Sequence, residues 1–255
     1  MRLITIPISH YCEKARWGLA YAGLDYQEQA HLQVLHYLAV LPHSRLGMVP
    51  VLLTANETIC DSSEILRFAD RHLADQNKLY PPESRAEVER LEDHYDEQLG
   101  VETRRWTYYH WLTEPAREVM RTAAQLTPKW QQLVGPFFFP LLRVFLNIKL
   151  GISTASVEAG LKIIESGFDD VAERLADGRP FLCGARFTAA DLSFACMAAP
   201  VLLPPEYGVR LPRPVEAPVS ARADIERFRR HPAGQFALRL FSDRRLRHGV
   251  SAKSR

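Results

Sequence analysis

A polar segment that holds two prolines, residues 74–84 (ADQNKLYPPES), divides this 255-residue chain into two parts with different patterns. Before the segment, short runs of strand-forming residues alternate with helical stretches. After it, the sequence has helical periodicity and no convincing strand pattern. This change predicts a small α/β domain over residues 1–75, then a linker and an all-α helical bundle over residues 84–255.

In the first part the predicted order of elements is strand, helix, strand, helix, strand, strand, helix. A proline stops the first strand, a glycine ends the first helix, and Asp61-Ser62 suits the N-cap of the last helix. The expected elements are strands at 3–6 and 26–30, helices at 12–23 and 34–41, a hairpin with strands at 51–54 and 58–60, and a helix from 61 to 73.

The second part begins with a long helical stretch, residues 85–112, and a further helix covers residues 161–175. Thr188 and Asp191 resemble a capping box at the start of another helix. Residues 203–220 contain five prolines and predict an extended loop, after which a last helix starts near Arg222 and breaks at Pro232.

Composition indicates an ordinary globular protein, with 47% hydrophobic and 24% charged residues and a formal net charge of +2. The four cysteines form no CxxC pair, which disfavours a zinc site or a disulfide framework and suits a reducing, cytoplasmic compartment. The most apolar run, residues 136–152, carries two prolines and two basic residues. It is too short and too interrupted for an integral membrane segment, so we expect a buried helix or a pocket wall, with a helix on a membrane surface as the alternative.

Three short motifs in the first part carry the candidate chemistry. The first is SHYCEK, residues 9–14, between the first strand and the first helix. Free N–H groups and the helix dipole at that position favour an anion beside Ser9. A plain N-cap serine is the alternative interpretation.

The second motif is Val49-Pro50 at the entrance to the hairpin. A cis bond there would turn the Val49 N–H and C=O outward, where they can pair with an extended peptide. The third is Asp61-Ser62, where helix N–H groups and a hydroxyl suit a ligand carboxylate and Asp61 suits an ammonium group. A simple helix cap is again the alternative.

In combination, the order and spacing of these motifs resemble the glutathione transferase superfamily. The first motif is similar to the CPYCxK segment of glutaredoxins, and an Asp-Ser pair follows Pro50 by eleven residues. The resemblance extends over the whole chain. It implies a thioredoxin-like domain that binds glutathione, a helical domain with an apolar second-substrate pocket, and a homodimer.

Carried over residue by residue, the resemblance gives Ser9 the catalytic hydroxyl of serine-type classes such as zeta, where omega-like classes have cysteine. Val49 and Pro50 then hold the cysteinyl backbone of glutathione, and Asp61 and Ser62 hold its γ-glutamyl end. Met48 departs from the pattern, because many members have Lys or Gln there near the glycyl carboxylate.

His36 or Arg45 is therefore expected to contact the glycyl carboxylate. Cys12 lies three residues after Ser9 and has no cysteine partner, so we assign it to packing. The resemblance implies no metal, and the histidines have no metal-site spacing such as HExxH.

The second substrate is expected to be a small, largely apolar electrophile. Tyr11 and, on the long helix, Tyr95, Trp106 and Tyr109 are the candidate pocket residues, with the interdomain core as an equal alternative for the helical three. The basic, aromatic stretch at residues 104–111 does not indicate nucleic acid binding, because its side chains spread around the helix.

The sequence thus predicts a cytoplasmic, serine-type glutathione transferase. Alternatives on the same thiolate are a dehalogenase, an etherase, an isomerase or a peroxidase. A non-catalytic binding or scaffold protein is the alternative from another class, and a thiol-disulfide oxidoreductase is disfavoured because residue 9 is serine.

Overall fold

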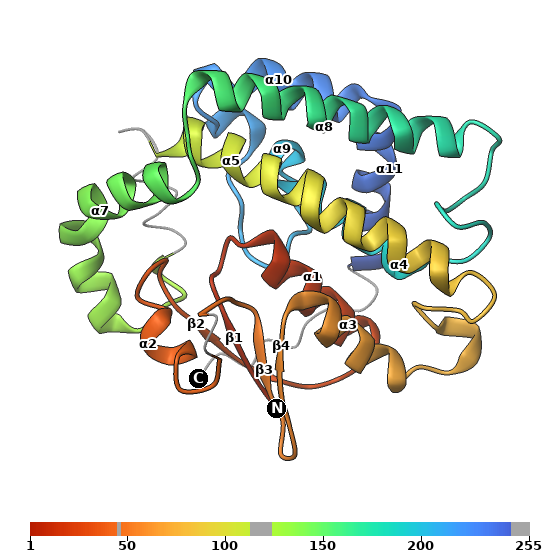
Figure 1. Cartoon of the computed structure of the whole chain (residues 1–255), viewed down its shortest axis with the longest axis horizontal. Helices are drawn as coiled ribbons and strands as arrows, with labels where there is room; N and C mark the ends of the chain where they lie inside the picture. Colours follow the sequence, from red (N-terminus) through yellow and green to blue (C-terminus); the bar gives the residue numbers. More distant parts are fainter. Residues whose placement is uncertain (45–46, 113–123, 246–255) are drawn as a thin grey trace.

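The computed structural model describes residues 1–44, 47–112 and 124–245 (Figure 1). The first part contains a four-stranded mixed sheet in the order β2-β1-β3-β4. Strand β1 pairs in parallel with β2 and antiparallel with β3, and β3 pairs antiparallel with β4. The strands are β1 (Arg2–Thr5), β2 (Gln27–Ala30), β3 (Val51–Leu53) and β4 (Thr58–Cys60).

Alternation along the strands divides the sheet's side chains between two cores. Leu3 and Leu52 face helices α1 (His10–Tyr21) and α3 (Ser62–Arg71), which pack against each other on one side of the sheet. Ile4 and Val51 face the opposite side, where α2 (Tyr37–Val40) covers them through Val40. The α/β fold predicted for the first part is confirmed, with helix boundaries that differ from the expected ones by one to three residues.

Helices make up the second part, as predicted. Two π-helical turns and short 3-10 turns interrupt them, and α9 runs through the centre with every residue but Pro200 buried. The elements are η1 (Asp75–Asn77), α4 (Arg85–His94), η2 (Tyr95–Leu99), α5 (Gly100–Trp111), α7 (Lys129–Lys149), α8 (Thr154–Leu175), α9 (Ala189–Leu202), η4 (Pro214–Glu216), α10 (Val219–Arg230), α11 (Pro232–Leu240) and η5 (Phe241–Arg245). The domain boundaries at 1–75 and 84–255 remain a prediction.

The start of α9 is built around the buried carboxylate of Asp191. This carboxylate accepts hydrogen bonds from the N–H and the hydroxyl of Thr188, each at 2.8 Å, and from the N–H of Leu182, also at 2.8 Å. The capping box expected from the sequence is therefore present. It also ties the loop before α9 to the first turn of the helix.

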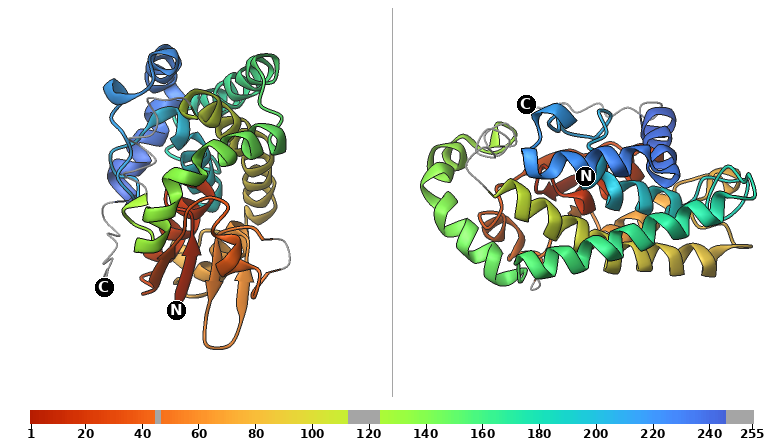
Figure 2. Two further views of the ribbon diagram at one scale, coloured as in Figure 1. Left: turned by 90° about the vertical axis from the view of Figure 1, so that its left-hand side faces the viewer. Right: turned by 90° about the horizontal axis from the view of Figure 1, so that it is seen from above.

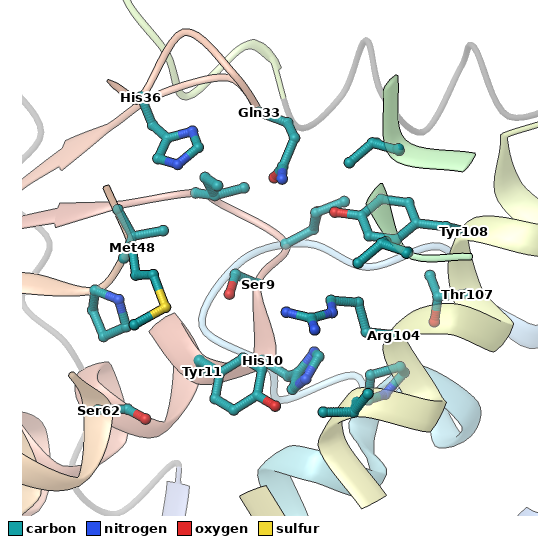
Figure 3. Close-up of a pocket in the computed structure, with 18 of the residues that line it drawn as sticks. Ser9, His10, Tyr11, Gln33, His36, Met48, Ser62, Arg104, Thr107 and Tyr108 are labelled. Carbon is teal, nitrogen blue, oxygen red and sulfur yellow. The ribbon is translucent and has the colours of Figure 1, made fainter. Parts of the chain in front are cut away.

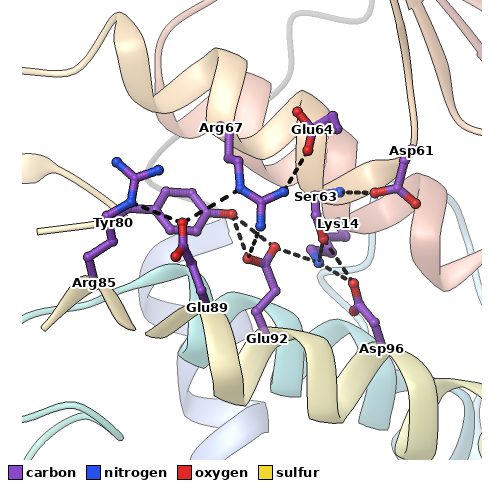
Figure 4. A network of polar contacts seen from close by, with 10 residues as sticks. All are labelled: Lys14, Asp61, Ser63, Glu64, Arg67, Tyr80, Arg85, Glu89, Glu92 and Asp96. Atoms are coloured by element: carbon purple, nitrogen blue, oxygen red, sulfur yellow. Dashed lines mark hydrogen bonds and ion pairs between the residues drawn. The ribbon is translucent and has the colours of Figure 1, made fainter. Parts of the chain in front are cut away.

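A buried polar network joins the two parts of the chain (Figure 4). The Lys14 ammonium group, on α1, lies 2.7 Å from a Glu92 carboxylate oxygen and 2.5 Å from an Asp96 carboxylate oxygen. It also donates to the Ser63 hydroxyl, and the Tyr80 hydroxyl donates to Glu92. Although burial disfavours its charge, the two carboxylates raise the pKa of Lys14. The network fixes α1 and α3 against α4 and η2.

Of the two alternatives for the apolar run, helix α7 contradicts the buried helix and agrees with the pocket wall, because Leu146, Lys149 and Leu150 line a cavity. In Figure 2 it lies at one end of the molecule, apart from the stacked helices. Leu133, Phe137 and Ile148 on its outer face are each more than 70% exposed. Its inner face still forms contacts, because Gln131 hydrogen-bonds to the Leu32 N–H and Leu146 is buried. In the described ranges, no helix is long and apolar enough to cross a membrane.

Candidate functional site

A cavity of about 620 Å³ lies where the edge of the sheet domain meets α5, the end of α7 and the loop after α9. It is the place where the motifs of the first domain meet (Figure 3). The sequence-predicted residues along its wall are Ser9, Tyr11, His36, Val49, Pro50, Asp61 and Ser62. Arg45 lies outside the described residues.

Ser9 is the N-cap of α1, and its hydroxyl oxygen accepts a long hydrogen bond of 3.4 Å from the Cys12 N–H. This bond uses an acceptor site and leaves the hydroxyl hydrogen available, because a hydroxyl carries one donor and two lone pairs. Among the described residues the Ser9 hydroxyl donates to no acceptor. The side chain is half-buried and points into the cavity (Figure 3).

Cys12 lies under Ser9 on α1 and is fully buried. Its sulfur accepts the Ile6 N–H, and burial raises the pKa of its thiol. Because the thiolate is the reactive form of cysteine, these surroundings suit a packed thiol rather than a nucleophile.

The Val49–Pro50 bond is cis, as expected from the sequence. Both residues line the cavity, and the Val49 N–H and C=O make no hydrogen bond to another described backbone group. A backbone donor and acceptor are thus available beside Ser9 for an extended ligand.

Asp61 and Ser62 begin α3 at the other end of the cavity floor. Asp61 has a φ of +90°, which is uncommon for a residue with a side chain, and its carboxylate accepts the Ser63 N–H at 2.7 Å. The Ser62 hydroxyl is buried and has no partner among the described residues. A buried polar group without a partner is costly, so this hydroxyl fits a site completed by a ligand.

His36 and Met48 lie at the α2 end of the cavity. The His36 Nε2–H donates to the Gly47 carbonyl at 3.1 Å, and burial lowers the pKa of His36 to about 4. The ring is therefore neutral at physiological pH and offers an acceptor at Nδ1, so it supplies no charge for a carboxylate. Lys149, on α7, brings a cation to the same wall, with its ammonium group 2.8 Å from the Tyr37 hydroxyl.

His10 and Tyr11 connect the floor of the cavity to the helical domain. The His10 Nε2–H donates to the Gly100 carbonyl at 3.1 Å, and burial together with the nearby Arg104 lowers the pKa of His10 to about 3. The Tyr11 hydroxyl donates to the Asp96 carbonyl at 2.7 Å, and burial raises its pKa to about 12. Both side chains are thus neutral and fixed in place.

The three helical residues expected in the pocket lie elsewhere. Tyr95 and Trp106 are each 1% exposed in the helical core, where Tyr95 packs against Phe194 and the Trp106 indole N–H bonds to Asp224. Tyr109 also packs against this core, and its hydroxyl lies 3.3 Å from that of Thr154. The alternative of a core role describes these residues better than the pocket role.

A different face of α5 forms the pocket wall. Besides Val101 it includes Arg104, Thr107, Tyr108 and Trp111, which follow the i, i+3, i+4, i+7 spacing of one helix face. This spacing was readable from the sequence, but several faces of this helix carry aromatic side chains, so periodicity could not select the one that faces the cavity. The π-helical turn η2 also breaks the regular period between Tyr95 and α5.

No three His, Cys, Asp or Glu side chains gather as metal ligands in the part of the chain that the structure describes. The arrangement instead offers a hydroxyl donor at a helix N-terminus, an unpaired backbone segment, and a helix start with an unpartnered serine. Together with the mixed sheet and the helical bundle, these features agree with the resemblance to the glutathione transferase superfamily.

Family models agree with this assignment. Glutathione S-transferase, N-terminal domain, matches residues 3–78, and Glutathione S-transferase, C-terminal domain, matches residues 154–231. Together they match more than half of the chain, which belongs to the glutathione transferase superfamily. A search of the curated proteins by sequence finds no match.

Solved structures with the same fold cover almost the whole chain. A glutathione S-transferase of Ceriporiopsis subvermispora in complex with glutathione has a TM-score of 0.62 at 16% identity, with 99% of each chain covered. A bacterial, zeta-class maleyl pyruvate isomerase has a TM-score of 0.60 at 17% identity, over 99% of this chain and 98% of that one. A glutathione S-transferase from Rhodospirillum rubrum has a TM-score of 0.57 at 21% identity, over 95% and 98%. At these identities the likeness shows the fold alone.

Proposed function

We propose that this protein is a cytoplasmic, homodimeric glutathione transferase of serine type that joins the glutathione sulfur to a small electrophile. The observation that carries the proposal is the convergence, on one cavity, of a free Ser9 hydroxyl hydrogen, the unpaired Val49 backbone and the unpartnered Ser62 hydroxyl. These groups lie in the order in which an extended tripeptide would need them.

Ser9 holds the reacting sulfur as a thiolate. A free thiol has a pKa near 8.5 and is a few per cent ionised at neutral pH, so a group that stabilises the anion raises the concentration of the nucleophile. A hydrogen bond to a charged group contributes about 1.5–3 kcal/mol, which lowers the thiol pKa by roughly one to two units. The N-terminus of α1 adds a favourable dipole at the same point.

The rest of glutathione is held along the sheet edge. Val49 pairs with the cysteinyl backbone, and the Ser62 hydroxyl and the first N–H groups of α3 bind the γ-glutamyl carboxylate. Asp61 lies beside them for the ammonium group. At the other end, Lys149 binds the glycyl carboxylate. It takes this role because Met48 stands where many members have Lys or Gln, and because the neutral His36 supplies no charge.

The buried state of Cys12 favours this mechanism over thiol-disulfide exchange, because exchange needs an accessible thiolate. In the transferase reaction the thiolate attacks the electrophilic carbon directly. The proton of the thiol passes to solvent, and a leaving group departs with its bonding electrons where the electrophile carries one.

Ser62→Ala tests the proposal without removing any bond that the described structure contains. We expect unchanged thermal stability and glutathione binding roughly tenfold weaker or more, measured by isothermal titration calorimetry. Cysteinylglycine, which lacks the γ-glutamyl group, should bind wild type and variant equally. Glutathione binding by Ser62→Ala at wild-type strength would remove the γ-glutamyl assignment, and no glutathione binding by wild type would refute the transferase proposal.

The contact between Lys149 and the glycyl carboxylate is tested by comparing two ligands, glutathione and its glycyl ester, in wild type and in Lys149→Met. Wild type should bind glutathione more tightly than its glycyl monoethyl ester, whereas Lys149→Met should bind the two about equally. A preference that survives in Lys149→Met would mean that another group holds the glycyl carboxylate.

A further inference from the structure

Arg104 has no acceptor for its guanidinium group among the residues that the structure describes. Its Nε–H is buried and unpaired, and none of its nitrogens forms an ion pair or hydrogen bond with any described residue. The neighbours of its charge are uncharged side chains: the Tyr11 ring, whose centroid lies 5.8 Å away, His10 and Tyr108. Figure 3 shows the side chain extending from α5 into the cavity, toward Ser9.

This isolation sets Arg104 apart from the buried cations of the chain. Lys14, Arg16 and Arg245 are each at most 4% exposed, and each forms an ion pair with a carboxylate. Even Arg105, the next residue on α5, pairs with Glu102 and donates to the Leu150 carbonyl. An arginine with a buried, unsatisfied Nε–H at a cavity wall is prepared for an anionic acceptor that enters from the cavity.

The surroundings of Arg104 suit an anion attached to an apolar body. Tyr108 lies one helical turn further along α5, and burial raises the pKa of its hydroxyl, which therefore stays protonated as a second donor. Trp111, Leu146 and Leu203 supply an aromatic and aliphatic wall beside these polar groups.

The carboxylates of the cavity do not compete for Arg104. Asp96 is paired with Lys14, and Asp61 accepts the Ser63 N–H at the start of α3. Glu97 is exposed and forms no ion pair with Arg104. The remaining cation, Lys149, contacts Tyr37 on the α2 side of the cavity.

We propose that Arg104 binds the carboxylate of the second substrate, so that the preferred electrophiles are small aromatic or unsaturated acids rather than neutral apolar molecules. This inference rests on the proposed function and adds an acid group to the largely apolar substrate expected from the sequence. The carboxylate would form a two-pronged bond with the guanidinium group, while the apolar body packs on Trp111 and holds the electrophilic carbon near the sulfur beside Ser9.

A matched pair of electrophiles tests the inference. 4-Chloro-3-nitrobenzoate and 4-chloro-3-nitrobenzamide have nearly the same shape and differ in charge. With either, the thiolate forms the C–S bond, the C–Cl bond breaks, and chloride leaves with the bonding pair. We expect Arg104→Met to lower kcat/KM for the benzoate roughly 10- to 100-fold, chiefly through KM, and to change the value for the benzamide less than threefold.

Arg105→Met is the control, because it removes a positive charge from the same helix outside the cavity. Arg105→Met should change kcat/KM by the same factor for the benzoate and for the benzamide. Equal loss for both substrates in Arg104→Met, with a raised pKa of the bound thiol, would overturn the inference and make Arg104 a partner of the thiolate. An undiminished rate with the benzoate would overturn it as well.

Binding of unreactive analogues separates this inference from the transferase proposal. Calorimetry without glutathione should give tighter binding of 3-nitrobenzoate than of 3-nitrobenzamide to wild type, and the difference should vanish in Arg104→Met. That result would support the anion site even if glutathione did not bind. Equal binding of the two analogues to wild type would refute the anion site even if glutathione transfer were established.

Discussion

Replacing Lys14 by methionine should show how strongly the buried network holds the two domains together. The change keeps most of the apolar volume and removes one charge from a site where Lys14 and Glu92 are both fully buried. Glu92 would then keep the Tyr80 hydroxyl and a longer ion pair with Arg67 at 3.9 Å, and Asp96 would keep the Ser63 hydroxyl. Breaking a buried ion pair from one side costs about 3–5 kcal/mol of unfolding free energy, since it leaves an uncompensated charge.

For a chain of this length, each kcal/mol shifts the melting temperature by about 2–4 °C, so we expect Tm to fall by roughly 6–20 °C. Differential scanning calorimetry at pH 7.5 measures the shift. The control is Arg230→Met, which breaks an exposed pair with Glu226 and should change Tm by no more than about 2 °C.

The loss of stability in Lys14→Met should depend on pH. In wild type, burial disfavours the charge of Glu92, but Lys14 outweighs it and holds the pKa of Glu92 below its usual value of 4.5. The stability that this lowered pKa contributes is fully present above the pKa of Glu92 in the unfolded chain. It is lost as pH falls through the pKa of Glu92 in the folded protein. Without Lys14, burial raises the pKa of Glu92. As pH falls toward 5, Glu92 should therefore become protonated in Lys14→Met, which removes the buried charge and part of the loss of stability.

The Tm difference between wild type and Lys14→Met should therefore shrink as pH falls from 7.5 to 5. A difference as small as that of Arg230→Met, or one that does not change with pH, would refute the assignment of the network as a buried, charged clamp.

Three further predictions concern the catalytic hydroxyl, the helical core and the assembly. Ser9→Ala should slow conjugation roughly 10- to 100-fold at neutral pH and recover as pH rises and the thiolate forms unaided, whereas Cys12→Ala should lower Tm with an unchanged pH–rate profile; the reverse pattern would make Cys12 the reacting group. Asp191→Ala should lower the free energy of unfolding in urea by about 3 kcal/mol or more, because three buried donors lose their acceptor. Asp177→Ala, which breaks an exposed contact with Arg179, is the control and should leave the unfolding midpoint unchanged. Sedimentation equilibrium at micromolar concentration should give twice the chain mass of 29.1 kDa, and a value near one chain mass would contradict the homodimer.

Local patterns in the sequence were enough to predict which residues form the floor of the cavity. Ser9, Val49 and Ser62 each lie where a strand meets a helix or a proline sets the chain direction, so cap chemistry and spacing placed all of them along one cavity. The same local rules predicted the capping box at Asp191 and the break before Pro232. These features depend on residues within a few positions of one another.

The roof of the site could not be predicted in this way, because it depends on how helices rotate and pack. On α5, the contact with α8 and α9 buries Trp106 and turns Arg104 and Tyr108 toward the cavity, a choice that the aromatic pattern of the helix leaves open. Lys149 reaches the site only because α7 folds back beside α2, across more than a hundred residues of chain.

The sequence by itself therefore determined the order of the elements, the change from an α/β part to a helical part, and the residues that line the floor of the cavity. The tertiary structure decided which helix faces close the cavity, and it left Arg104, at the cavity wall, without an acceptor among the described residues. The physical reason is that hydrogen bonding and capping act along a few residues of chain, whereas burial and charge pairing are settled by groups that meet only when the two domains pack together.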